Sequence, residues 1–116
     1  MESKIGTITF LFTDVEGSTK MWEEAPDLMP RSIARHDEIA LAVIAENGGR
    51  VVKSRGEGDS VFAVFPRASE AVAAAAKLQI ALRNEPWPAK TPIKVRMALH
   101  TGEAQERDED YYGVTY

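Results

Sequence analysis

The spacing of apolar and polar positions divides the chain into segments of two kinds. Four runs are rich in β-branched and aromatic residues or alternate apolar with polar side chains, which predicts strands. Two longer segments repeat apolar residues at helical spacing and end at glycine or proline. The strands are predicted over 5–13, 50–53, 60–65 and 92–100, and the helices over 28–47 and 68–83.

The order of these elements predicts the fold class. The sequence β-α-β-β-α-β is the ferredoxin-like arrangement, an α+β sandwich. Two helices would cover one face of a four-stranded antiparallel sheet, and a turn after 17–19 would lead into a short helical segment that reaches Trp22. The other face of such a sheet remains free for a ligand, a partner or a second copy of the chain.

Composition narrows the class of protein. The 116 residues carry 14 Lys+Arg against 18 Asp+Glu, a net charge of −4, which argues against a nucleic-acid-binding protein. Cysteine is absent, which excludes disulfides, zinc–cysteine sites and thiol nucleophiles. No apolar run approaches the about 18 residues of a membrane helix, and no signal-peptide cleavage site follows the first strand. We expect a cytoplasmic domain that does not contact membranes.

Two aspartates stand where predicted strands end or begin. Asp14 follows the first strand and Asp59 lies in the hairpin turn, and the predicted fold brings both to one edge of the sheet. Two carboxylates placed together repel each other, and a divalent cation relieves that repulsion. Oxygen ligands without His or Cys favour Mg²⁺ or Mn²⁺. Each aspartate could instead simply cap a turn.

A small glycine–hydroxyl segment follows the first aspartate. Gly17, Ser18 and Thr19 lie at a strand-to-helix turn, where exposed backbone N–H groups can bind an anion such as a polyphosphate. The Walker pattern does not occur in the sequence, so this is not a P-loop.

Three segments resemble the catalytic domain of class III adenylate and guanylate cyclases, most closely the bacterial kind. They read FTDVEGST over 12–19, GEGDS over 56–60 and VRMALHTGE over 95–103. The resemblance runs from about residue 5 to 116. It implies conversion of ATP, or GTP, to a 3′,5′-cyclic nucleotide and pyrophosphate with two Mg²⁺ or Mn²⁺ ions. It also implies a homodimer with shared active sites and a fused regulatory domain.

The resemblance assigns roles to individual residues. Asp14 and Asp59 match the two metal-binding aspartates, and Val15 matches the neighbour whose backbone carbonyl touches metal. Lys53 and Asp110 match residues that read the nucleotide base.

The chain departs from the family pattern in two places. The family has Lys-x-x-Gly-Asp, whereas Lys53 here precedes Glu57 by four residues and Arg55 takes that place before Asp59. We favour Asp59 as the second ligand, with Glu57 as the alternative. The family also continues Gly-x-x-x-Asn-x-x-x-Arg, and the 116 residues stop before that Asn. We therefore interpret 1–116 as the N-terminal portion of a cyclase domain, impaired on its own.

Two alternatives of other classes stay open. The chain could be an inactive cyclase-like module that binds nucleotide or mediates dimerisation, or a polymerase-type palm domain, which shares the fold and the paired carboxylates. Four further side chains are interpreted as structural. We expect Trp22, Trp87 and Phe65 to pack in the core or a lid, and Arg96 to form an ion pair with a nearby acid.

Overall fold

The chain folds into one antiparallel sheet covered by helices. The computed structural model describes residues 4–52, 59–107 and 110–112. Five strands pair in the order β2-β3-β1-β4-β5, and every pairing is antiparallel. The first four strands have the ferredoxin-like order, so the predicted α+β class is confirmed. The strands are β1 (Lys4–Val15), β2 (Arg50–Val51), β3 (Ser60–Phe65), β4 (Val95–Arg107) and β5 (Asp110–Tyr112).

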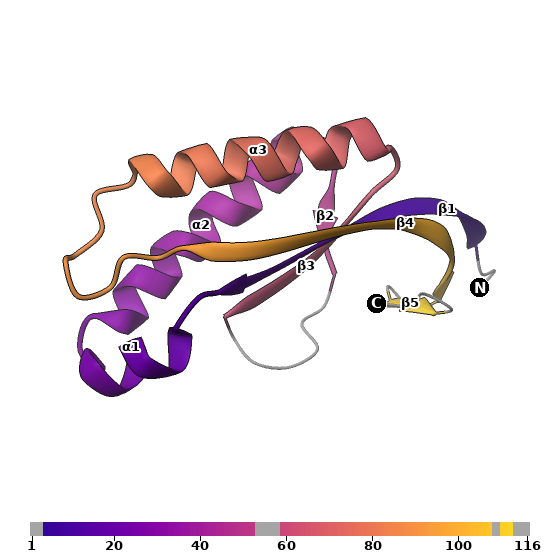
Figure 1. The fold of residues 1–116 in the computed structure, drawn as a ribbon. Coiled ribbons are helices and arrows are strands. Elements are labelled where there is room, and N and C mark those ends of the chain that lie inside the picture. Colours follow the sequence, from indigo (N-terminus) through magenta and orange to yellow (C-terminus); the bar gives the residue numbers. More distant parts are fainter. Residues whose placement is uncertain (1–3, 53–58, 108–109, 113–116) are drawn as a thin grey trace.

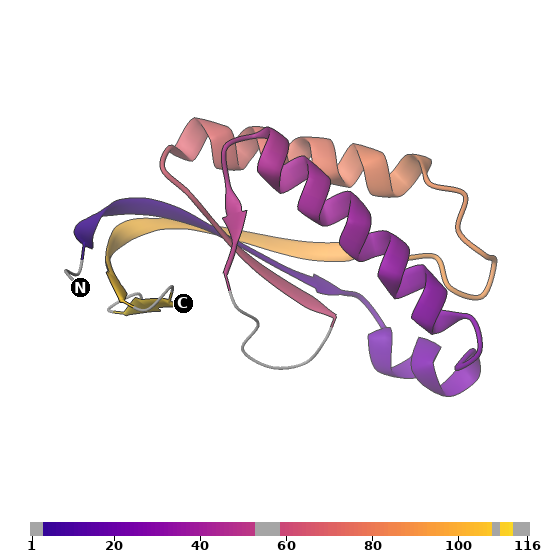
Figure 2. The same cartoon turned by 180° about the vertical axis from the view of Figure 1, so that it is seen from behind.

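Two long helices cover one face of this sheet. Figures 1 and 2 show α2 and α3 on the same side of the strands, with the short α1 at the end where β1 finishes. Gly48 adopts a φ of 85° just after α2, which stops the helix at the predicted place. The described helices are α1 (Ser18–Glu24), α2 (Met29–Glu46) and α3 (Ala68–Asn84). None of them is long and apolar enough to cross a bilayer.

The core lies between the sheet and the two long helices. Leu11 of β1 packs with Ile44 of α2, Ala71 of α3 and Phe65 of β3, and all four are buried. A second cluster fills the other end of this layer, where Leu78 of α3 is fully buried. The core assignment of Phe65 is therefore confirmed.

The helix-free face of the sheet carries a group of stacked phenylalanines. Side chains alternate between faces along a strand, so Phe10 and Phe12 point away from the helices, opposite to Leu11. Phe62 of β3 stacks on both, with ring centroids 4.5 Å from Phe12 and 5.4 Å from Phe10. These rings fix the position of β1 against β3.

The fourth strand differs from its prediction. It runs over Val95–Arg107 rather than 92–100, and it is paired with β1 as far as Lys4 opposite Glu106. Residues 103–107 read Glu-Ala-Gln-Glu-Arg, so no apolar alternation marks them as a strand. Pairing to β1 and to β5 extends the strand where its own sequence gives no signal.

Candidate functional site

Strand pairing places the two candidate aspartates at one edge of the sheet. Asp14 is the next-to-last residue of β1, and its register partner in β3 is Ser60. Asp59 directly precedes that serine in the chain. Asp14 and Asp59 also line one pocket, which confirms that the fold brings them together.

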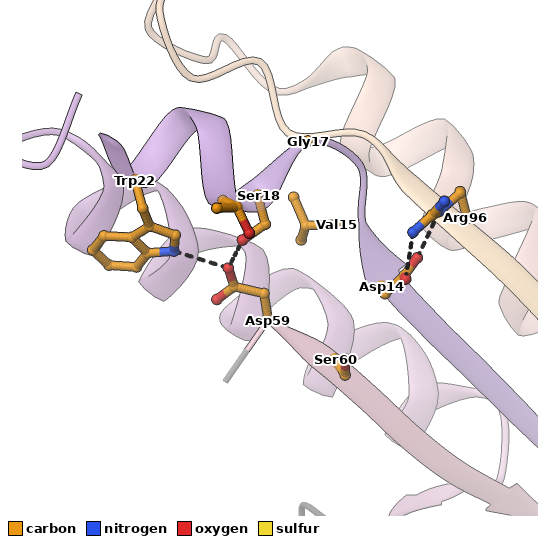
Figure 3. Close-up of a pocket in the computed structure, with 9 residues that line it drawn as sticks. Asp14, Val15, Gly17, Ser18, Trp22, Asp59, Ser60 and Arg96 are labelled. Carbon is orange, nitrogen blue, oxygen red and sulfur yellow. Dashed lines mark hydrogen bonds and ion pairs between the residues drawn. The ribbon is translucent and has the colours of Figure 1, made fainter. Parts of the chain in front are cut away.

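The pocket opens between the end of β1, the start of β3 and the short helix α1 (Figure 3). Its volume is about 670 Å³. Two carboxylates and one guanidinium supply its charged groups. The lining residues are Asp14, Val15, Gly17, Ser18, Thr19, Trp22, Asp59, Ser60 and Arg96.

Asp14 forms a two-point ion pair with Arg96 of β4. The two residues are register partners, and Nε and Nη2 of Arg96 lie 3.0 and 2.7 Å from the two carboxylate oxygens of Asp14. These hydrogen bonds, together with the negative charge of Asp14, raise the pKa of Arg96, so the guanidinium stays protonated. The predicted ion pair of Arg96 is confirmed, and its partner is a candidate metal ligand.

This ion pair is too exposed to hold the fold together. The side chain of Arg96 is 67% exposed and that of Asp14 is 45% exposed. Exposed pairs contribute between about 0 and 1 kcal/mol. We therefore expect Arg96→Leu to lower the free energy of unfolding, measured in urea, by no more than about 1 kcal/mol. A loss above about 2 kcal/mol would mean that the pair has a structural role.

Asp59 is held by α1. Its Oδ2 accepts a hydrogen bond from Ser18 Oγ and another from Trp22 Nε1, the latter at 2.9 Å. Trp22 is 37% exposed, so the expectation that it packs in the core is wrong, and its packing in a lid stays a prediction. The sequence contains a signal for this shared partner, because Ser18 and Trp22 are four residues apart and therefore lie on one face of a helix.

The glycine–hydroxyl segment forms the entry to α1. Gly17 adopts the left-handed conformation with φ of 65°, and its carbonyl accepts a hydrogen bond from the N–H of Met21. Gly17 and Thr19 are exposed and Ser18 is half-buried, and all three line the pocket. The first N–H groups of a helix have no partner within it, so an anion in the pocket could approach them.

The chemistry of the donor set fits a hard divalent cation. Asp14 and Asp59 both contribute carboxylates to the lining of the pocket, and Val15 lines it too, with a buried side chain. Within the described ranges no group of three or more His, Cys, Asp or Glu could hold a metal. Mg²⁺ needs only one or two carboxylates when water and phosphate oxygens complete its shell. The residues present are therefore sufficient for Mg²⁺ or Mn²⁺ bound together with a polyphosphate.

The predicted base-reading residues cannot be placed in this pocket. Lys53 lies outside the described residues, as do its possible substitute Arg55 and the alternative second metal ligand Glu57. Asp110 begins β5, and its side chain is outside the described part of the structure. Their assignment stays a prediction.

Comparison with known proteins relates most of the chain to one family. The family model for the adenylate and guanylate cyclase catalytic domain matches residues 1–107. A protein of Mycobacterium tuberculosis that is named only as uncharacterized is 44% identical over 110 residues. That match covers 95% of this chain but only 36% of the relative, so the chain spans about a third of its length.

An adenylate cyclase of Podospora anserina is 30% identical over 133 residues, which cover 93% of this chain and 6% of that protein. Among solved structures, an adenylate/guanylate cyclase/hydrolase from Silicibacter pomeroyi superposes with a TM-score of 0.81 at 28% identity. The superposition covers 97% of this chain and 66% of the Silicibacter chain.

Proposed function

Because this chain belongs to the adenylate and guanylate cyclase catalytic domain family, we propose that it forms part of an enzyme that converts ATP to 3′,5′-cyclic AMP and pyrophosphate. One observation carries the proposal: Asp14 and Asp59 line the same pocket as the glycine–hydroxyl segment 17–19. A cation site beside a set of backbone N–H groups suits a nucleoside triphosphate. The choice of ATP over GTP rests on the names of relatives such as the Podospora adenylate cyclase.

Two Mg²⁺ or Mn²⁺ ions would be held by the carboxylates of Asp14 and Asp59, with the backbone carbonyl of Val15 as a further ligand. When bound, such ions lower the pKa of an attacking hydroxyl, here the ribose 3′-hydroxyl, and neutralise charge at the α-phosphate. The carboxylates themselves orient the ions and bring negative charge close to the reacting centre.

Other residues would bind the substrate. The N–H groups of Gly17, Ser18 and Thr19 receive the polyphosphate, and Lys53 and Asp110 recognise the base. The active unit is a cytoplasmic homodimer whose two copies share the sites, and a regulatory domain fused to this one would control it.

A second candidate function is an inactive module that binds nucleotide or mediates dimerisation. One observation favours it: both carboxylates are engaged by side chains of the chain itself, Asp14 by Arg96 and Asp59 by α1. The 116 residues do not include the Asn and Arg of the family pattern, which bears on an assay of these residues alone and not on the choice between the two candidates. Removing a group that stabilises charge in the transition state costs about 10²- to 10³-fold in rate.

A Mn²⁺-supported assay for cyclic AMP distinguishes the two candidates. We expect the 116-residue chain to form little or no cyclic AMP. The same chain, extended by a cyclase-domain segment that carries the family continuation Gly-x-x-x-Asn-x-x-x-Arg, should gain turnover because the extension supplies this Asn and Arg. Both lengths are assayed at matched, high concentrations that favour dimers.

The extended chain with Asp59→Ala is the control, and it should lose the turnover that the extension supplies. An extended chain that binds ATP with Mn²⁺ but forms no cyclic AMP would favour the inactive module. Strong turnover by the 116-residue chain itself, lost on Asp59→Ala, would contradict the expected impairment.

A further inference from the structure

Asp59 is held by two donors from the same helix. Ser18 Oγ and Trp22 Nε1 both donate to its Oδ2, and the indole nitrogen lies 2.9 Å away. A carboxylate oxygen has about two lone-pair sites, so these two hydrogen bonds engage the whole oxygen. In Figure 3 both side chains reach toward Asp59 from α1.

The two carboxylates of the pocket therefore point to different partners. Figure 3 shows Asp14 directed at Arg96 and Asp59 directed at Trp22 and Ser18, so the carboxylates do not face each other. A cation bound by both aspartates needs an oxygen from each in its coordination shell. α1, rather than Asp14, sets the orientation of Asp59 in this arrangement.

The indole N–H of Trp22 donates its hydrogen bond to a carboxylate of the pocket. The side chain is 37% exposed, and no residue of α1 is buried. Trp87 gives the contrast, because its ring packs against the core and its indole N–H donates to the carbonyl of Leu82 at 2.8 Å. The two tryptophans therefore differ in what they hold: Trp87 donates to a core carbonyl, and Trp22 donates to Asp59 in the pocket.

We propose that Trp22 is a positioning residue for Asp59. Its indole N–H holds the carboxylate on α1 and releases it when a divalent cation draws Asp59 toward Asp14. The inference rests on the proposed function, since it takes Asp59 as a cation ligand. The indole and the cation compete for the same carboxylate, so Trp22 weakens binding of the cation alone and changes its own hydrogen bonding when the cation binds.

The first test observes the indole N–H directly. The ¹⁵N-labelled 116-residue chain has two tryptophans, hence two indole N–H signals in NMR, and Trp87→Phe assigns them. Mg²⁺ is used because it is diamagnetic and does not broaden nearby signals. We expect the Trp22 signal to shift saturably with Mg²⁺ while the Trp87 signal stays in place. The shift should be absent in Asp59→Asn at the same Mg²⁺ concentrations.

The second test measures the affinity for Mn²⁺ alone by electron paramagnetic resonance. Trp22→Phe keeps an aromatic ring but removes the donor, and its exposed position makes the change compatible with folding, which circular dichroism checks. We expect Trp22→Phe to bind Mn²⁺ about three- to tenfold more tightly, the effect of removing one competing hydrogen bond. The matched control, Trp87→Phe, should stay within about twofold of the unaltered chain.

The outcomes separate the inference from the proposed function. An unmoved Trp22 signal at saturating Mg²⁺ overturns the inference and leaves the cation site standing. The inference is also overturned if Trp22→Phe binds Mn²⁺ no more than about twofold more tightly than the unaltered chain does. If Asp59→Asn binds Mn²⁺ as tightly as the unaltered chain, the cation site of the proposed function is wrong.

Discussion

Asp14→Ala should abolish Mn²⁺-dependent binding of ATP while leaving the fold intact. Asp14 is one of two carboxylates that line the pocket, and losing a direct ligand should weaken the Mn²⁺-dependent part of the affinity by at least about 100-fold. The free energy of unfolding should change by no more than about 1 kcal/mol, because the Asp14–Arg96 pair is exposed. Calorimetry with ATP, in Mn²⁺ and separately in a chelator, measures the metal-dependent part.

The comparison with the chelator matters because the substitution leaves Arg96 without its partner. An unpaired guanidinium attracts phosphate with or without metal, so total ATP affinity alone would be misleading. Asp27→Ala is the matched control, since it removes an exposed aspartate outside the pocket. Equal Mn²⁺-dependent affinity in Asp14→Ala and Asp27→Ala would contradict the metal assignment of Asp14.

Gly49→Ala should destabilise the fold by about 1–3 kcal/mol, a large share of the stability of a small domain. A Cβ at this position would lie 2.4 Å from Cε2 of Phe65, a ring that is fully buried in the core. Neither the ring nor the backbone between α2 and β2 can move away without disturbing its neighbours. Urea unfolding measures the loss.

Gly6→Ala provides the control for this effect. A Cβ at Gly6 would meet nothing within 4 Å, so that variant should keep its free energy of unfolding within about 0.5 kcal/mol. Similar losses of unfolding free energy in both variants would show that the contact with Phe65 is not the reason why position 49 requires glycine.

Much of the fold was predictable because its elements carry strong local signals. The β-branched run 60–65 is β3 without change, and the predicted helix 28–47 differs from α2 by one residue at each end. The second half of β4 was not predictable, because residues 103–107 are mostly polar and become a strand only by pairing with β1 and β5. Local patterns do not contain that information.

The site was predictable to the level of backbone position and no further. The meeting of Asp14 and Asp59 follows from strand order, which the sequence indicates. The partners of their carboxylates depend on side-chain directions and on the register of β1 with β4, which places Arg96 opposite Asp14. The hydrogen bond from Trp22 to Asp59 was missed, although the four-residue spacing of Ser18 and Trp22 was visible, because an aromatic residue on a short helix is more often interpreted as packing than as a hydrogen-bond donor.

The stacked phenylalanines bear on the conformational entropy that the proposed ligand binding would cost. Phe12 and Phe62 stack at 4.5 Å two positions from Asp14 and Ser60, which are themselves paired across β1 and β3. The strand backbone is already fixed here in the folded chain. A backbone that became ordered only on binding would cost about 1–2 kcal/mol per residue. Ordering on binding is then confined to side chains, at about 0.5–1.5 kcal/mol each. At Asp14, binding would therefore cost the conformational entropy of one side chain rather than the larger entropy of a loop backbone.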